Sequence, residues 1–580
     1  MKELLMGNEA IARGAVEAGV KVVAAYPGTP SSEIPNTISK IAKKYGIYFE
    51  WSTNEKVAYE VAFAGAVTGL RSMVTMKHVG LNVASDAFMA SAEVGVEGGY
   101  VVVSADDPSL HSSQNEQDNR YYARLANIPC IEPGSPQEAK DYTIKAFEIS
   151  EQYKMPVMLR TTTRVNHTRG DVELGDILSL ERTPKFEKNP RRYVTVPTNA
   201  RVLRENIIKK MDSFKSDLDT IEGKGSLGVI ASGIAYNYVK ETLLLLDVEA
   251  EIYKVAVTHP LSNAIIDFLN RHDDVIVVEE LEPIVETEVR SMAQKENIPV
   301  TIYGKDIVPR AFELNTTRVA NAFRKYKNLP LEEVREFDIP ARPPILCPGC
   351  PHRASFYAIR KAAPKGIYPS GIGCYTLGFV PPLSAVDSCL CMGASIGFSC
   401  GLSEFVSDKI ICTIGDSSFF HAGIPPLLDA VYNKHTFVVM ILDNETTAMT
   451  GHQPHPGTGI TGMGESVRKI YPEKLTEAMG IKTDVVDPHD VKRTIEVLKE
   501  AVKSDELRVV IARRKCIFLE GAERKNPYVV TDECTGCRLC LNQLGCPAIE
   551  FVEGKAVINE LCNGCGVCAQ ICPSNAITGD

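Results

Sequence analysis

No apolar run in the 580-residue sequence reaches the roughly 18 residues of a membrane-spanning helix, so no membrane association is expected. Glu3 and Glu9 stand where a secretion signal needs an apolar core, which favours a cytoplasmic protein. Basic residues are not in excess, because 63 Lys and Arg against 73 Asp and Glu give a net charge of −10. Such a chain has no overall charge that would attract nucleic acid or an anionic membrane surface.

The composition is ordinary except for cysteine. Hydrophobic residues make up 44% and charged residues 23%, which excludes collagen, low-complexity disorder and a coiled coil. The length predicts about four domains. Of the 17 cysteines, eight fall between Cys534 and Cys572. Without a secretion signal, this clustering indicates metal binding rather than disulfide bonds.

Most of the chain alternates short apolar strands with helical segments, which predicts an α/β protein with doubly wound parallel sheets. The predicted domains cover residues 1–170, 196–330, 340–520 and 525–580, with connectors over 171–195 and 331–344. The predicted strands include 72–78 and 100–106, then 226–233, 251–257 and 273–280, and finally 409–416, 436–444 and 507–514. Ligands of such sheets bind beyond the carboxyl ends of the strands, where Thr29, His78 and Asp106 lie in the first domain.

The cysteines near the end of the chain form two similar runs, preceded by a polar stretch over 521–527 that is predicted to be a tether. The runs are Cys534-x2-Cys537-x2-Cys540-x5-Cys546-Pro547 and Cys562-x2-Cys565-x2-Cys568-x3-Cys572-Pro573. This pattern resembles bacterial two-cluster ferredoxins, in which the fourth cysteine of each run binds the other cluster. The resemblance implies a ferredoxin-like α+β domain. It also implies one [4Fe-4S] cluster on Cys534, Cys537, Cys540 and Cys572, and a second on Cys546, Cys562, Cys565 and Cys568. Structural zinc is the alternative, but zinc sites use paired knuckles rather than triplets followed by Cys-Pro.

Two polar segments follow neighbouring predicted strands in the third domain. Asp416 follows one strand and Asn444 the next, so both side chains are expected at one edge of the sheet. Mg²⁺ prefers such hard oxygen ligands and shares them with a diphosphate. The spacing resembles the thiamine diphosphate signature G-D-G … N-N, with Ser417 and Asp443 as departures from it.

That resemblance implies a complete cofactor site. Mg²⁺ would be held by Asp416, Asn444 and the backbone carbonyl of Thr446. The diphosphate would lie against Gly415 and Ser417 and against a helix start at Gly393, Ala394 and Ser395, where backbone amides bind anions.

Several further motifs are distinctive. They are YPGTPSSE (26–33), TNEKVAYEVA (53–62), KHVGLNVASD (77–86), CPGCPHR (347–353) and GIGCYTLG (371–378). Together with the two cysteine runs they resemble the 2-oxoacid:ferredoxin oxidoreductases, and within them the family of large (alpha) subunits of indolepyruvate ferredoxin oxidoreductase. The resemblance covers essentially the whole chain. It implies a multidomain thiamine-diphosphate-binding fold, in the order pyrimidine-binding, transketolase-C-terminal-like, diphosphate-binding and ferredoxin domains.

The resemblance also implies an activity in amino-acid catabolism. Such enzymes oxidatively decarboxylate aryl 2-oxoacids such as indole-3-pyruvate with coenzyme A, giving aryl-acetyl-CoA and CO2, and pass the electrons through [4Fe-4S] clusters to ferredoxin. A smaller beta subunit completes the heteromer. The alternatives are the same chemistry on pyruvate or branched 2-oxoacids, a ferredoxin-like electron carrier without thiamine chemistry, and a non-oxidative decarboxylase, which has no use for the cysteine runs.

Catalytic candidates lie in the first domain. Glu55 matches the family's activating carboxylate, which hydrogen-bonds the cofactor pyrimidine N1′. Thr29 matches the threonine that contacts the substrate carboxylate. His78 and His421 are further candidates at or after strand ends, although a lone histidine is more often a satisfied polar residue. Glu33 and Glu60 compete with Glu55 for its role.

Four other cysteines match a third cluster of shorter relatives in this family. They are Cys347, Cys350, Cys374 and Cys516. The resemblance implies a [4Fe-4S] cluster beside the thiamine. The alternative is four buried thiols, which are common in protein interiors.

Overall fold

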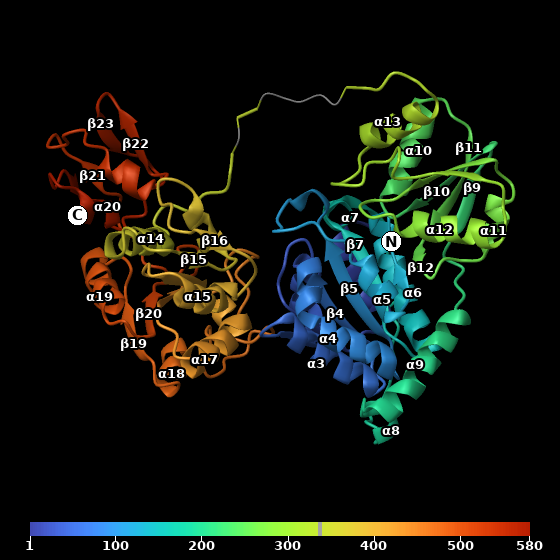
Figure 1. Cartoon of the computed structure of the whole chain (residues 1–580), viewed down its shortest axis with the longest axis horizontal. Coiled ribbons are helices and arrows are strands. Elements are labelled where there is room, and N and C mark those ends of the chain that lie inside the picture. The colour runs from blue at the N-terminus through green and yellow to red at the C-terminus, as the bar shows by residue number, and fades with distance from the viewer. Residues whose placement is uncertain (334–338, 341, 580) are drawn as a thin grey trace. The chain divides into compact units, whose positions relative to one another are not determined.

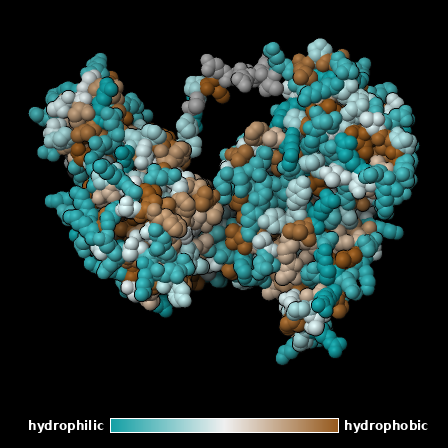
Figure 2. All heavy atoms as spheres, viewed as in Figure 1, coloured by the Kyte–Doolittle hydropathy of each residue, from teal (hydrophilic) through white to brown (hydrophobic). Residues whose placement is uncertain are grey.

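The computed structural model describes residues 1–333, 339–340 and 342–579. The chain folds into two compact units, Met1–Asp338 and Ile339–Asp580 (Figure 1). The predicted connector 331–344 includes residues 334–338 and 341, which lie outside the described residues. Among the described helices none is long and apolar enough to cross a membrane. The surface drawn in Figure 2 is mostly hydrophilic, with separate apolar patches.

A seven-stranded sheet forms the centre of the first unit. Its strands run in the order β12 (Val257–His259), β6 (Cys130–Ile131), β7 (Val157–Thr162), β5 (Tyr100–Asp106), β4 (Ser72–Lys77), β2 (Val22–Ala25) and β3 (Tyr48–Trp51). Every pair is parallel except β12 with β6. The inner strands are apolar and buried because helices cover them, as expected for a parallel sheet, whereas the edge strand β3 is partly exposed.

The helices of this first layer fall into two groups. One group is α1 (Gly7–Glu17), α2 (Glu33–Tyr45) and α6 (Pro136–Tyr153), and the other is α3 (Glu55–Val67), α4 (His78–Val94) and α9 (Pro197–Asp212). The shorter elements are α5 (Arg120–Ala126), α7 (Thr163–His167), α8 (Pro190–Tyr193) and the pair β1 (Lys2–Met6) with β8 (Arg169–Glu173). Although the predicted second domain starts at residue 196, α9 packs on α4 and adds Ile207 to the core of the first layer.

A second, five-stranded sheet follows in the same unit. Its order is β14 (Thr301–Tyr303), β13 (Asp274–Val278), β10 (Leu227–Ser232), β11 (Ala250–Val255) and β9 (Thr220–Gly223), with only β9 antiparallel. Its helices are α10 (Ala235–Leu245), α11 (Ala264–Leu269), α12 (Ile284–Lys295) and α13 (Thr316–Tyr326). Strand β12 leaves this second layer and pairs with β6 of the first sheet.

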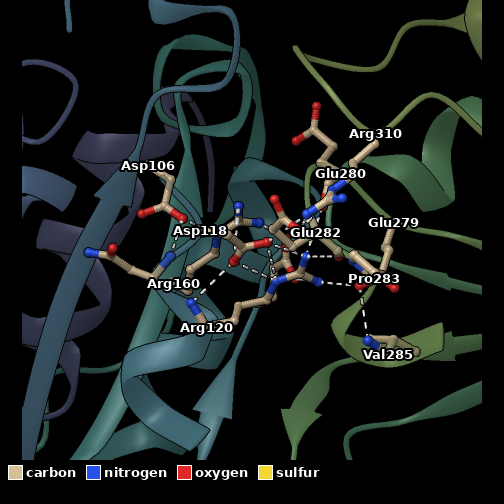
Figure 3. A network of polar contacts seen from close by, with 12 residues as sticks. Asp106, Asp118, Arg120, Arg160, Glu279, Glu280, Glu282, Pro283, Val285 and Arg310 are labelled. Atoms are coloured by element: carbon tan, nitrogen blue, oxygen red, sulfur yellow. Dashed lines mark hydrogen bonds and ion pairs between the residues drawn. The ribbon is translucent and has the colours of Figure 1, made fainter. Parts of the chain in front are cut away.

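A buried ion network joins the two layers of the first unit (Figure 3). Arg120 and Arg160 are fully buried. Arg120 donates from Nη2 to Asp118 Oδ2 at 2.6 Å and from Nη1 to Glu279 Oε2 at 2.7 Å, so it links α5 to the end of β13. Arg160 donates from Nε to Asp106 Oδ2 at 2.9 Å.

The network contains more carboxyl groups than guanidinium groups. The buried acids are Asp106, Asp118, Glu132, Glu279 and Glu280. Burial raises the pKa of Asp106 to about 7, and burial also raises the pKa of Glu280 to about 7. Burial therefore works against ionisation of both carboxyl groups, although Arg160 favours their charged forms.

The second unit is built on a six-stranded, wholly parallel sheet. Its order is β16 (Ser388–Cys389), β15 (Pro369–Ser370), β17 (Ile411–Gly415), β18 (Val438–Asp443), β20 (Arg508–Arg513) and β19 (Lys482–Val486). The helices around it are α14 (Pro351–Ala362), α15 (Ala394–Phe405), α16 (Asp416–Ser418), α17 (Ile424–Tyr432), α18 (Pro472–Ala478) and α19 (Val491–Lys503).

The cysteine-rich tail is small and has mixed structure. It contains the antiparallel pairs β21 (Val529–Val530) with β24 (Ile577–Thr578) and β22 (Ile549–Val552) with β23 (Lys555–Ile558), and the helix α20 (Val567–Ile571). Residues 522–528 form no helix or strand, as expected of a tether. The tail nevertheless packs against the sheet domain. Ala354 of α14 and Val491 of α19 share one apolar core with Leu544, Ile549 and the tail cysteines. The predicted fold class, parallel α/β sheets followed by a ferredoxin-like α+β domain, is confirmed.

Candidate active site

Asp416 and Asn444 lie at one edge of the third sheet. Asp416 follows β17, Asn444 follows β18, and these two strands are hydrogen-bonded neighbours. Both side chains are buried. Asn444 Oδ1 has no hydrogen-bond partner within the described part of the chain. A buried, unsatisfied amide oxygen beside a buried carboxylate fits a hard divalent cation.

A second carboxyl group strengthens the case for a cation here. Burial and the neighbouring Asp416 raise the pKa of Asp443 to about 6. Arg513 donates from Nε to Asp443 Oδ2 at 2.7 Å, and His455 Nε2 lies 3.2 Å from Asp416 Oδ2. Because two adjacent carboxylates repel each other, a divalent cation at this edge would lower the energy of the ionised pair.

The predicted diphosphate cradle begins at Gly393, just before α15. Gly393 has φ of +79°, and a Cβ there would lie 2.7 Å from Ala422 Cβ, so only glycine fits. Ser395 Oγ is buried and has no hydrogen-bond partner among the described residues. Its unsatisfied hydroxyl and the amides that open α15 fit an anion. Thr446 is buried in the loop after β18, and Ser417 Oγ accepts a hydrogen bond from Thr447 Oγ1 at 3.0 Å.

Two histidines in this region were missed by sequence reasoning. His352 is buried in α14, and its Nε2 lies 3.4 Å from Asn444 Nδ2. Burial lowers the pKa of His352 to about 4, so this ring is neutral. His455 reaches Asp416 from the loop after β18. Of these two histidines, only His352 could have been found from the sequence, because it lies within the CPGCPHR motif. The predicted candidate His421 is buried in a turn of π-helix over Phe419–Gly423.

Glu55 occupies the first position of α3 in the first unit. The Asn54 side chain caps this helix by accepting the Val57 N–H at 2.9 Å. Glu55 is only 6% exposed, and a Cβ on Gly80 of α4 would come within 2.7 Å of its Cγ. Gly80 therefore lets α4 approach the carboxylate closely.

The two competing glutamates have ordinary surroundings. Glu33 accepts a hydrogen bond from Asn8 Nδ2 at 2.8 Å and is partly exposed beside His167. Glu60 is exposed and forms an ion pair with Lys56 one helical turn away. Both environments are those of surface helix residues, which leaves Glu55 as the buried carboxylate of the three.

Thr29 and His78 lie beyond strands β2 and β4. The Thr29 carbonyl accepts from Ser112 Oγ at 3.3 Å. His78 opens α4 and is fully buried, and burial together with Lys77 lowers its pKa to about 4. Lys77, which sequence reasoning missed, donates to the Ser112 carbonyl at 2.6 Å, and burial lowers its pKa to about 8. Asp106, which was expected near a ligand at the carboxyl end of its strand, forms part of the buried ion network with Arg160.

The eight tail cysteines line two separate cavities. One cavity is lined by Cys534, Cys537, Cys540 and Cys572. The other is lined by Cys546, Cys562, Cys565 and Cys568, with Cys350 of the third set at its wall. All are free thiols. The tail thiols are divided between the cavities four and four, as the crossed ferredoxin pattern implies, and each group of four fits one [4Fe-4S] cluster.

The four cysteines of the proposed third set also converge. Burial, Cys347 and Cys374 raise the pKa of the Cys350 thiol to about 12. Burial, Cys516 and Cys347 raise the pKa of the Cys374 thiol to about 11. The Cys516 N–H donates to the Asn444 carbonyl at 3.0 Å, so this set adjoins the candidate cation site. These four half-buried free thiols therefore lie near one another beside the candidate cation site, as the ligands of a metal cluster would.

Three family models match the chain. A model described as pyruvate flavodoxin/ferredoxin oxidoreductase, thiamine diphosphate binding, matches residues 13–223. A thiamine pyrophosphate enzyme C-terminal binding domain matches residues 371–512, and a 4Fe-4S binding domain matches residues 555–578. The fold and these matches define a thiamine-diphosphate-dependent oxidoreductase that also carries iron–sulfur chemistry.

Curated relatives narrow this class. The indolepyruvate oxidoreductase subunit IorA of Methanothermobacter marburgensis is 48% identical over 99% of this chain and 96% of its own length. The protein of the same name from Thermococcus kodakarensis is 47% identical over 99% and 96%. A solved 2-oxoglutarate:ferredoxin oxidoreductase from Magnetococcus marinus is 14% identical over 56% of this chain and 65% of its own, with a TM-score of 0.44. The chain belongs to the indolepyruvate oxidoreductase subunit IorA family, among the 2-oxoacid:ferredoxin oxidoreductases.

Proposed function

We propose that this chain is the large subunit of an enzyme that oxidatively decarboxylates aryl 2-oxoacids, with indole-3-pyruvate as its substrate. Coenzyme A would be the acyl acceptor, aryl-acetyl-CoA and CO2 the products, and ferredoxin the electron acceptor. A smaller beta subunit would complete the heteromer. The substrate and the partner follow the names of the relatives, which are called indolepyruvate oxidoreductase subunits.

One observation carries the oxidative part of this proposal. The Cys516 N–H donates to the carbonyl of Asn444, so a cysteine of the third set and a candidate cation ligand are joined by one hydrogen bond. A decarboxylase that released an aldehyde would have no use for thiols beside its cofactor. An enzyme that removes electrons from the bound substrate needs an acceptor there.

Each cofactor has a proposed set of holding residues. Mg²⁺ would be bound by Asp416, Asn444 and Thr446, and the diphosphate would lie against Gly415, Ser417 and the α15 start over 393–395. Three [4Fe-4S] clusters would be held by the three cysteine sets. When bound, thiamine diphosphate supplies the electron sink for decarboxylation and the clusters accept single electrons.

The remaining candidate residues would bind and orient the cofactor and the substrate. Glu55, desolvated beneath Gly80, is placed to hold a proton at its carboxylate oxygen, and water has little access to it. Thr29 and His78 would contact the substrate, since both follow strands at the edge where parallel sheets bind ligands. The neutral His78 ring can both donate and accept a hydrogen bond.

The test is an assay of the complete heteromer with indole-3-pyruvate, pyruvate and a branched 2-oxoacid. We expect CoA-dependent ferredoxin reduction, with the highest kcat/KM for indole-3-pyruvate. A clear preference for pyruvate or for the branched acid would overturn the substrate assignment. Redox-active clusters without bound thiamine would show an electron carrier instead.

A further inference from the structure

Arg353 is a buried cation without a carboxylate partner. It is the third residue of α14, three positions after Cys350, and it is 6% exposed. In the described ranges its guanidinium donates to backbone carbonyls and forms no ion pair with an acidic side chain. A buried guanidinium is costly unless an anion lies nearby, so its counter-charge has to come from another kind of group.

The hydrogen bonds of Arg353 connect two cysteine sets. Its Nη1 donates to the carbonyls of Leu544 and Gly545, each at 2.7 Å, and these residues directly precede Cys546. Its Nη2 donates to the carbonyl of Leu346, directly before Cys347. The fork geometry of arginine allows one side chain to hold both segments at once.

The charge of Arg353 also acts on both sets. The guanidinium interacts electrostatically with Cys546 and Cys565 of the second tail set and with Cys347 and Cys350 of the third set. Cys350 and Arg353 line the same cavity as the four thiols of the second tail set. Cysteines of the first tail set, such as Cys537, line the other cavity, which Arg353 does not reach.

Gly349 shows how closely the two segments approach. It lies between Cys347 and Cys350 with φ of +68°, and a Cβ there would come within 2.1 Å of the Asn563 side chain. Asn563 stands directly after Cys562 and donates from Nδ2 to the Pro348 carbonyl at 3.0 Å. The second tail set and the third set are therefore packed directly against each other, and Arg353 fills the junction.

We propose that Arg353 is a positioning residue that seats the second tail cluster against the third cluster and makes both easier to reduce. The inference rests on the proposed clusters. Reduction adds one negative charge to each cluster, and the guanidinium charge in the shared low-dielectric junction stabilises that charge. Hydrogen bonds and nearby charge are known controls of cluster potential.

The experiment is an EPR-monitored redox titration of the full-length protein in its heteromer. Arg353→Met removes both the positive charge and the guanidinium that donates hydrogen bonds to the two segments, whereas Arg353→Lys keeps the charge. The matched control is Arg360→Met, since Arg360 is an exposed arginine of the same helix that also donates to backbone carbonyls. Cys537→Ser, in the first tail set, assigns the signal of that cluster.

In Arg353→Met we expect the reduction potentials of the second tail cluster and the third cluster to fall by at least about 59 mV. This is a tenfold change in the equilibrium constant for one electron. The first tail cluster should keep its potential. Arg353→Lys should restore most of the shift, and Arg360→Met should leave all potentials as they are. Selective loss of iron from the two adjoining sets would support the positioning role. Unchanged potentials in Arg353→Met, or uniform iron loss from every set, would overturn it.

The iron content of the unaltered protein separates this inference from the proposed function. About twelve irons per chain agree with three clusters, and about eight would remove the third. The change in reduction potential of the second tail cluster in Arg353→Met is measured in either case. Substrate assays are not needed for either readout.

Discussion

Cys516 and Asn444 are linked by a backbone hydrogen bond of 3.0 Å, from the Cys516 amide to the Asn444 carbonyl. Asn444 follows β18, and Cys516 lies three residues beyond the end of the neighbouring β20. Parallel pairing of these strands therefore brings a candidate cation ligand and a candidate cluster ligand to one sheet edge.

Replacing Asp416 by alanine is expected to abolish retention of thiamine diphosphate while leaving the tail clusters in place. The loss of a carboxylate leaves the diphosphate charge poorly compensated at this sheet edge. Thiamine and iron contents of the purified protein measure both effects. Asp408→Ala, an exposed aspartate of the same unit, is the control. Full thiamine content in Asp416→Ala would place the cation site elsewhere.

Glu55→Gln is expected to bind the cofactor but to lose exchange of the thiazolium C2 proton and with it the activity. Glutamine keeps a hydrogen bond to the pyrimidine, but it cannot hold the proton that a carboxylate holds. NMR of C2 deuterium exchange measures this step. Glu60→Gln, on the exposed side of the same helix, should behave as the unaltered protein. Activity within tenfold, about 1.4 kcal/mol in barrier, would remove Glu55 from this role.

Deleting residues 525–580 is expected to abolish ferredoxin reduction and to destabilise the second unit. The deletion uncovers Ala354 and Val491, which are buried against the tail, and removes the Gln570 side chain that donates to the His489 carbonyl at 2.7 Å. Scanning calorimetry should show a lower Tm for one transition and an unchanged Tm for the first unit. Cys537→Ser separates the two effects, because it removes a ligand without uncovering the core. An unaltered calorimetric profile after deletion would contradict the shared core.

The buried ion network predicts that the first unit loses stability as pH rises toward and through neutrality. The folded-state pKa of Glu280 is about 7 against an ordinary value of 4.5, so its contribution is complete below about pH 4.5 and is lost as pH rises through 7. The expected slope is about 1.4 kcal/mol per pH unit for each such carboxyl between these limits. Urea unfolding from pH 5 to pH 8 measures it. Glu280→Gln should flatten the profile, whereas the exposed Glu205→Gln should not. An equal slope in Glu280→Gln would assign the pH dependence to other groups.

Much of this architecture could be predicted because it depends on local sequence. Apolar runs such as 436–444 became buried strands, and β18 ends at Asp443, so the placement of Asn444 followed from strand pairing alone. The division of the tail cysteines into two sets followed from the resemblance to two-cluster ferredoxins, in which the fourth cysteine of each run joins the other set, and the two cavities are lined in that way.

The features that sequence could not supply depend on contacts between distant segments. Arg120 meets Glu279 across 159 positions, and His455 meets Asp416 across 39, and no local pattern marks either pair. The packing of the tail on α14 was hidden for the same reason, since Arg353 reads as a surface arginine until Leu544 is found beside it. The predicted second domain, 196–330, includes the residues of helix α9. The apolar face of this helix contacts α4 of the first layer.

The strand β12 decides how the first unit can move. Val257 and His259 are paired with Ile131 and Cys130, and the Glu132 N–H donates to the Ala256 carbonyl at 2.9 Å, so a strand of one layer is stitched into the sheet of the other. Rotating the layers apart would break this backbone pairing at the seam. A rotation of one layer against the other would also separate Arg120 from Glu279, so both backbone pairing and a buried ion pair oppose it.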